Sequence, residues 1–132
     1  MVDALSIALS GLMAQNQQLS ATASNIANAS TTGALPTPQQ PASTVYKPLN
    51  VGYVTQAGGG VTANVTADQN GYSAVSDPSS AYANNKGLVA APNVDLSQEI
   101  VNLIETKIAS KADVDVIKTQ DQMTGELLDT VS

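Results

Sequence analysis

The chain contains no cysteine, histidine, tryptophan, phenylalanine or arginine among its 132 residues. Without histidine and cysteine, it lacks the usual general base, the thiolate nucleophile and the ligands of the common zinc sites. Eleven acidic residues outnumber five lysines, and the net charge is −6. Clustered cations that could neutralise nucleic-acid phosphates are therefore missing. We expect no enzyme, no bound metal or cofactor, and no nucleic-acid partner.

Long apolar runs are also scarce. Residues 4–14 form one near the start, but Asp3 precedes it where a secretory signal would carry lysine or arginine, and no clear A-x-A cleavage site follows. No stretch approaches the roughly 20 apolar residues that span a bilayer. The sequence predicts neither a cleaved signal peptide nor direct insertion into a membrane.

Proline and tyrosine are confined to the middle of the chain, where all six prolines and all four tyrosines lie between Pro36 and Pro92. The flanks contain only Gly11 and Gly125 as helix breakers. This layout predicts a mainly α fold with a small β insert. We expect an N-terminal helix within residues 1–30, a loop and β-hairpin insert over residues 31–92, and a C-terminal helix within residues 93–132. The two helices are expected to pair as a coiled-coil-like core.

The N-terminal segment carries a heptad-like apolar seam with alternating three- and four-residue spacings and one polar member. The seam consists of Val2, Leu5, Leu9, Leu12, Asn16, Leu19, Ala23 and Ile26. Asp3 is the only charged residue before Lys47, and the positions off the seam are mainly serine, threonine and glutamine. Such neutral groups need only a hydrogen-bond partner when buried, whereas charges are costly to desolvate. The pattern favours a helix enclosed by other helices over one that packs only within its own domain.

The C-terminal segment is apolar-periodic but acidic, with three lysines against eight acidic residues from Asp95 onwards. Asp95 is the predicted N-cap, and Gln98 completes a capping box. The apolar stripe slips from heptad register between Lys107 and Asp113, and an amphipathic helix laid against the first is the simplest interpretation. The residues expected at the assembly interface are Leu5, Leu9, Leu12, Asn16, Leu19, Ile26, Ile100, Leu103, Ile104, Val114 and Ile117.

Two alternating runs in the insert, at residues 49–55 and 61–67, predict a β-hairpin with its turn at residues 58–60. Residues 68–71 predict a turn rather than a calcium site, because the downstream ligands of a calcium loop are absent. Asp113 and Asp115 are two apart on the predicted helix and so face different directions. They are poorly placed as an acid–base pair.

Short motifs follow one another along nearly the whole chain. Ser24-Asn25-Ile26-Ala27-Asn28 precedes Thr31-Thr32-Gly33, and further motifs occupy residues 60–65, 77–78, 92–95 and 99–105. In this order and spacing they resemble bacterial flagellar rod and hook proteins, and those of the proximal rod in particular. The motif residues are Asn25, Ile26, Ala27, Asn28, Thr32, Gly33, Pro92, Asn93, Val94 and Asp95. Two features of the family are replaced here, its aromatic near Gly33 and an Arg-Ala-Tyr-x-Ala-Asn stretch at residues 108–113.

The resemblance implies a structural subunit of the flagellar basal-body rod, whose terminal helices assemble into the shaft that transmits motor torque. Its implied partners are copies of itself, other rod proteins, the flagellar export apparatus during secretion and the surrounding basal-body rings. It would lie in the periplasmic rod after export without a cleaved signal peptide. Asn25 and Asn28 are expected to fix the exit of the first helix, with left-handed backbone at Asn28 or Gly33. The alternative is a soluble acidic coiled-coil adaptor that forms no filament.

Overall fold

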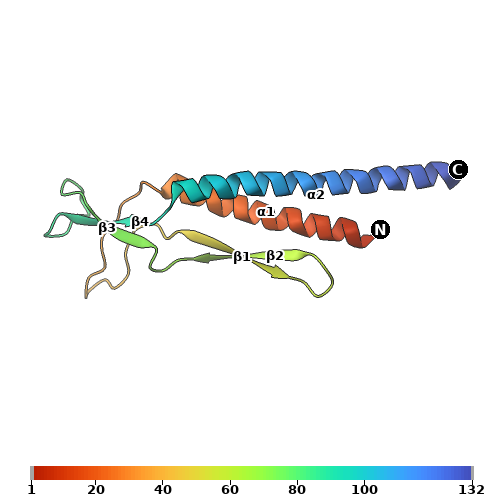
Figure 1. The fold of residues 1–132 in the computed structure, drawn as a ribbon. Coiled ribbons are helices and arrows are strands. Elements are labelled where there is room, and N and C mark those ends of the chain that lie inside the picture. Colours follow the sequence, from red (N-terminus) through yellow and green to blue (C-terminus); the bar gives the residue numbers. More distant parts are fainter. Residues whose placement is uncertain (1, 132) are drawn as a thin grey trace. The chain divides into compact units, whose positions relative to one another are not determined.

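A computed structural model describes residues 2–131 and contains two helices and four short strands in that range (Figure 1). In chain order they are α1 (Val2–Asn28), β1 (Leu49–Thr55), β2 (Val61–Ala67), β3 (Tyr72–Ser76), β4 (Leu88–Pro92) and α2 (Leu96–Val131). The predicted mainly α fold, with a small β insert between terminal helices, is confirmed. The chain forms two compact units, one from residues up to 20, 51–65 and from 101 onwards, and the other from residues 21–50 and 66–100.

The end of α1 is fixed by side-chain and backbone hydrogen bonds rather than by a left-handed residue. Asn28 Nδ2 donates to the carbonyl of Ser24 at 2.9 Å, and both the amide and the hydroxyl of Thr31 donate to the carbonyl of Asn28 at 3.0 and 2.7 Å. The two bonds from Thr31 satisfy the carbonyl of Asn28, which the helix leaves unpaired at its C-terminus. The expected left-handed geometry at Asn28 or Gly33 is therefore wrong. The positive φ values within residues 2–131 belong to Gly59, Gly60 and Gly87.

Helix α2 begins at Leu96, directly after the predicted N-cap. Asp95 Oδ1 accepts hydrogen bonds from the amides of Ser97 at 2.9 Å and Gln98 at 3.2 Å, which confirms the cap. The helix then continues for 36 residues. The slip in its apolar stripe does not interrupt it, because a change of register moves the stripe around the helix without removing any backbone hydrogen bond.

The predicted hairpin is confirmed as the β1–β2 pair. Gly59 and Gly60 turn the chain with φ of 87° and 88°, a conformation that side chains disfavour. The amide of Gln56 donates to the carbonyl of Gly60 at 3.1 Å, and the amide of Gly59 donates to the carbonyl of Gln56 at 2.9 Å. Residues along β2 alternate between half-buried and exposed at first, as the sequence predicts for a strand with one covered face.

A second hairpin, β3–β4, was not predicted. Its antiparallel register places Tyr72 opposite Pro92 and Ser76 opposite Leu88. In the connection, Asn84 Oδ1 accepts hydrogen bonds from the amides of Lys86 at 2.8 Å and Leu88 at 3.0 Å. Five-residue strands rich in alanine and serine give little periodic signal, so the pattern of residues 72–92 did not reveal this pair.

Within the second unit, Gly33 lies at a close contact between backbone segments. It exchanges hydrogen bonds with Ala90 of β4, at 2.9 Å from its amide and 2.8 Å to its carbonyl. A Cβ atom at Gly33 would lie 2.5 Å from the amide nitrogen of Val45, which is far too close. Glycine is required here by close approach of two backbone segments, although its φ is ordinary.

Candidate assembly surface

Small and neutral side chains form the face of α1 that packs within the first unit. Ala8 and Ala14 are buried, with 4% and 2% of their surface exposed. Gln15 Nε2 donates to Asp113 Oδ2 of α2 at 2.8 Å, and a Cβ atom at Gly11 would lie 2.5 Å from the same oxygen. The two helices are therefore side by side here, and a glycine, a glutamine and an aspartate lie at the contact (Figure 1).

The leucine seam lies on a different face of α1. Leu5, Leu9 and Leu19 keep 42%, 44% and 43% of their surface exposed, Asn16 is exposed, and Leu12 is half-buried. With about 3.6 residues per turn, these positions lie roughly 80–160° around the helix from Gly11. The chain itself therefore leaves most of the predicted seam uncovered. No charged residue occurs on α1 after Asp3, so the uncovered face is uncharged and, apart from Asn16, apolar.

The predicted interface residues of α2 divide between covered and uncovered positions. In the first unit, Leu103, Val114 and Ile117 are half-buried, whereas 50% of Ile104 is exposed. In the second unit, Ile100 is 54% exposed and Ile26 of α1 is half-buried. Toward its C-terminus, α2 exposes further large side chains. These are Ile108, Val116, Met123, Leu127 and Leu128.

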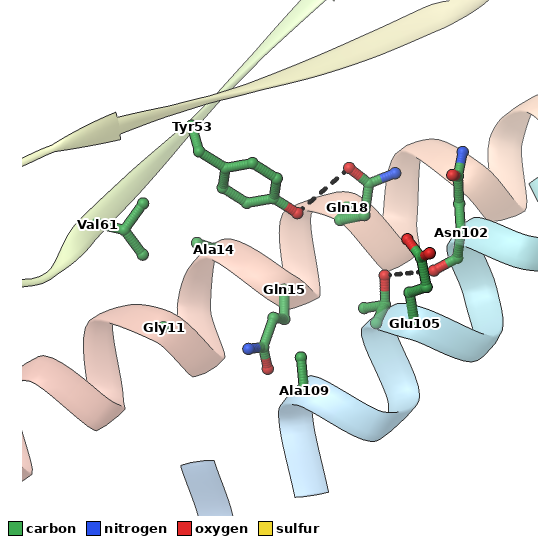
Figure 2. A pocket seen from close by; sticks show the side chains of 10 residues that line it. Gly11, Ala14, Gln15, Gln18, Tyr53, Val61, Asn102, Glu105 and Ala109 are labelled. Atoms are coloured by element: carbon green, nitrogen blue, oxygen red, sulfur yellow. Dashed lines mark hydrogen bonds between the residues drawn. The ribbon is translucent and has the colours of Figure 1, made fainter. Parts of the chain in front are cut away.

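The β1–β2 hairpin contacts α1 on another face within the first unit. Ser10 Oγ accepts a hydrogen bond from the amide of Val61 at 3.1 Å and donates to the carbonyl of Ile7 at 2.7 Å. Tyr53 Oη donates to Gln18 Oε1 at 3.3 Å (Figure 2). Burial raises the pKa of the Tyr53 hydroxyl above its ordinary value.

A groove of about 370 Å³ opens in the first unit, with walls from both helices and the hairpin (Figure 2). It is lined by Gly11, Ala14, Gln15, Gln18, Tyr53, Val61, Asn102, Glu105, Thr106 and Ala109. Gln15 Oε1 is buried and has no hydrogen-bond partner. Glu105 supplies the only ionisable carboxylate of the lining.

Asn25 is the centre of a hydrogen-bond cluster in the second unit, with only 2% of its surface exposed. Its Nδ2 donates to the carbonyl of Leu49 at 2.9 Å and to Glu99 Oε1 at 2.6 Å. Its Oδ1 accepts from the amide of Leu49 at 2.8 Å and from Tyr46 Oη at 3.0 Å. One amide at the end of α1 is thus bonded to a residue before β1, to the start of β1 and to the first turn of α2.

Tyr46 belongs to this cluster but was not singled out from the sequence. Burial and, second, the nearby carboxylate of Glu99 raise the pKa of the Tyr46 hydroxyl above its ordinary value, against the opposing effect of a hydrogen bond with Ser24. The other motif residues have varied environments. Ala27, Thr32, Asn93 and Asp95 are exposed, Ile26, Asn28 and Val94 are half-buried, and Gly33 and Pro92 are buried.

Neither a metal-holding group of side chains nor a candidate membrane-spanning helix occurs in the described part of the chain. Residues 2–131 contain no group of three or more histidine, cysteine, aspartate or glutamate side chains placed to hold a metal ion. Neither helix, over its described length, is long and apolar enough to cross a membrane.

Sequence models of two protein families match the two ends of the chain. The family described as "Flagella basal body rod protein" matches residues 5–34, which include the leucine seam and Asn25. The family described as "Flagellar basal body rod FlgEFG protein C-terminal" matches residues 85–130, which include β4 and most of α2. Both matches define the same class of protein, a structural subunit of the flagellar rod.

Curated relatives identify the member of this class. The flagellar basal-body rod protein FlgC of Escherichia coli O6:H1 is 36% identical over 118 residues, covering 89% of this chain and 87% of the relative. FlgC of Yersinia enterocolitica is 36% identical over 86% and 84% of the two chains. FlgC of Buchnera aphidicola is 31% identical over 93% and 92%. The chain therefore belongs to the FlgC family of flagellar basal-body rod proteins.

Membership confirms the predicted function. The protein is a structural subunit of the flagellar basal-body rod, located in the basal body and assembling with other rod components. It belongs to a family of structural proteins rather than enzymes. The alternative of a soluble adaptor that forms no filament is not supported by these relatives.

Proposed function

We propose that this subunit occupies the proximal rod and assembles through its terminal helices, with residues 31–92 forming an insert. The helices would come from residues 1–30 and 93–132. The observation that carries the proposal is the uncovered seam: Leu5, Leu9 and Leu19 keep over two-fifths of their surface exposed on a helix that has no charged residue after Asp3. A face that is apolar and lacks charge is suited to a protein partner and poorly suited to water.

Burial of the seam in neighbouring subunits would stabilise the rod. Full burial of a leucine side chain contributes about 1.5–3 kcal/mol, so covering the exposed two-fifths contributes roughly 1 kcal/mol per leucine. Several such leucines per subunit, repeated along a shaft, give many contacts that must break together before the shaft bends. This is the physical basis on which the rod would transmit motor torque.

The route to that position is proposed from the chain's kinship. Its relatives are flagellar basal-body rod proteins, which supports passage through the flagellar export apparatus into a periplasmic rod. The partners in the finished structure would be copies of this chain, other rod proteins and the surrounding basal-body rings. Together with the seam, the interface would include Ile26, Ile100, Leu103, Ile104, Val114 and Ile117.

Replacement of seam leucines by aspartate tests the proposal. Leu9→Asp and Leu19→Asp place a charge on the surface that would be desolvated in the rod, so we expect export to continue while incorporation is lost. Val75→Asp is the matched control, because Val75 of β3 has the same 44% exposure as Leu9 but lies outside both helices. Secreted protein and purified basal bodies are assayed by immunoblot. Normal amounts of Leu9→Asp and Leu19→Asp in the rods, with normal swimming, would refute the proposal.

A further inference from the structure

The groove in the first unit is lined by residues suited to bind one long side chain. Its walls are small or apolar at Ala14, Val61 and Ala109, and the ring of Tyr53 borders it (Figure 2). Methylene groups pack well on such surfaces, and an aromatic ring also attracts a cation. Since Gln15 reaches from α1 toward α2 beside Ala109, the groove is closed on that side by an amide (Figure 2).

Two acceptor groups that line this groove, Gln15 Oε1 and the Glu105 carboxylate, lack a hydrogen-bond donor among the described residues. Gln15 commits its Nε2 to Asp113, which leaves its buried Oε1 without a partner. An unsatisfied buried acceptor is costly, and native proteins pair nearly all of them. The carboxylate of Glu105 forms no hydrogen bond or ion pair within residues 2–131. No lysine is among the ten lining residues, so the lining itself supplies no cation.

We propose that the groove receives one lysine or arginine side chain from an adjacent rod protein of a different sequence. The head group would pair with Glu105 and approach Gln15, while its aliphatic stem would cover Ala14 and Val61. The inference rests on the proposed assembly into the rod. Charge complementarity favours a different protein over a second copy, because this chain has a net charge of −6, no arginine and only five lysines.

Site-specific photo-crosslinking in assembled basal bodies tests the inference. Tyr53 is replaced by the photoreactive aromatic p-benzoylphenylalanine in the full chain, because the ring lines the groove and is 52% exposed. We expect a cross-link to another rod protein, at a peptide that contains lysine or arginine. Glu105→Gln should lower the yield about fivefold, the loss expected for a partly exposed ion pair, and Glu105→Lys should abolish the cross-link.

Two controls separate this inference from the seam proposal. Glu126→Gln removes one negative charge from α2 outside the groove and should leave the Tyr53 cross-link unchanged. The same photoreactive residue at Leu9 reports on the seam. Cross-linking from Leu9 but not from position 53 would overturn the groove assignment while the seam proposal stands. A position-53 cross-link to a second copy of this chain, or one unaffected by Glu105→Gln and Glu105→Lys, would also overturn it.

Discussion

Asn25→Asp tests whether one buried amide holds the second unit together. The substitution keeps the size and shape of the side chain, so it leaves no cavity. It retains the acceptor for the amide of Leu49 and the hydroxyl of Tyr46, but it replaces the donor nitrogen with a second oxygen. That oxygen would face the carbonyl of Leu49 at 2.9 Å and Glu99 Oε1 at 2.6 Å.

The expected loss in the free energy of unfolding has two parts. Losing a neutral hydrogen bond costs about 1 kcal/mol and losing one to a charged group about 1.5–3 kcal/mol, so the lost donors account for roughly 2.5–4 kcal/mol. Repulsion between the new carboxylate and Glu99 adds to this, up to about 4 kcal/mol for two unit charges 4 Å apart at an effective dielectric constant near 20. Relative to the 5–15 kcal/mol typical of whole domains, about 3 kcal/mol or more is a large loss.

The pH dependence distinguishes the repulsion from a simple loss of bonds. A carboxyl group introduced beside Glu99 has a folded pKa raised above its unfolded value of about 3.9. The folded state then binds more protons than the unfolded state between these two pKa values, so the free energy of unfolding rises as the pH falls through that window. We expect Asn25→Asp to recover part of its lost stability between neutral pH and about pH 4, because a protonated carboxyl can again donate.

Urea unfolding followed by tyrosine fluorescence measures the effect without interference, since the chain has no tryptophan. Asn64→Asp is the matched control, because it makes the same change of charge on an exposed residue of β2. We expect the control to shift the free energy of unfolding by less than about 0.5 kcal/mol. The role assigned to the Asn25 amide would be refuted by an Asn25→Asp protein that keeps the wild-type urea midpoint at pH 7. It would also be refuted if the loss in the free energy of unfolding did not change with pH.

Further perturbations test other contacts. Gly33→Ala drives a methyl group against the backbone of Val45 and should lower the free energy of unfolding by about 2–3 kcal/mol, measured by urea titration; an unchanged midpoint would contradict the close approach. Gly11→Ala should destabilise the wild type, because of the clash with Asp113, but stabilise an Asp113→Ala background by up to about 1 kcal/mol through helix propensity; equal effects in both backgrounds would show no coupling. Because the pKa of Tyr46 is raised in the folded state, its protonated hydroxyl contributes stability in full below the unfolded pKa of about 10, and this contribution is lost as the pH rises through the higher folded pKa. Tyr46→Phe should therefore weaken the fall in stability above pH 10, measured by alkaline unfolding curves.

Helices and the first hairpin were predictable because their signals are local. The start of α2 follows from Asp95 alone, whose carboxylate caps the first turn, and β1–β2 follows from alternation around three consecutive glycines. The short β3–β4 pair depends on partners far apart in sequence. Gly33, which pairs with Ala90, is separated from it by more than fifty residues, and no periodicity reports such a contact.

The polar contacts of α1 were less predictable than its seam. A heptad pattern shows which residues share a face, but it does not show which face packs within the chain and which remains uncovered. Gly11 was the available signal, because a single glycine within a helix that otherwise lacks breakers indicates a close approach of another element. Its neighbour Asp113 could be named only from the fold, since the distance between the two is set by how α1 and α2 pair.

The distribution of side chains on α1 is the reverse of that in an ordinary globular helix, where leucines face the protein's own core. The buried hydrophobic residues among those described are mainly alanines, which bury little area. They are Ala8, Ala14, Ala21, Val45, Val89 and Ala90. Because apolar stabilisation scales with buried area, the isolated chain gains little from such a core and depends strongly on polar contacts such as those of Asn25.

The leucines that the chain leaves uncovered can instead stabilise an assembly. Under the proposed function, the subunit is therefore only weakly stable before incorporation and becomes rigid after it. Hydrogen exchange should show this directly: amides of α1 in the free chain should exchange faster than the same amides in the rod, and equal protection in both states would contradict the argument.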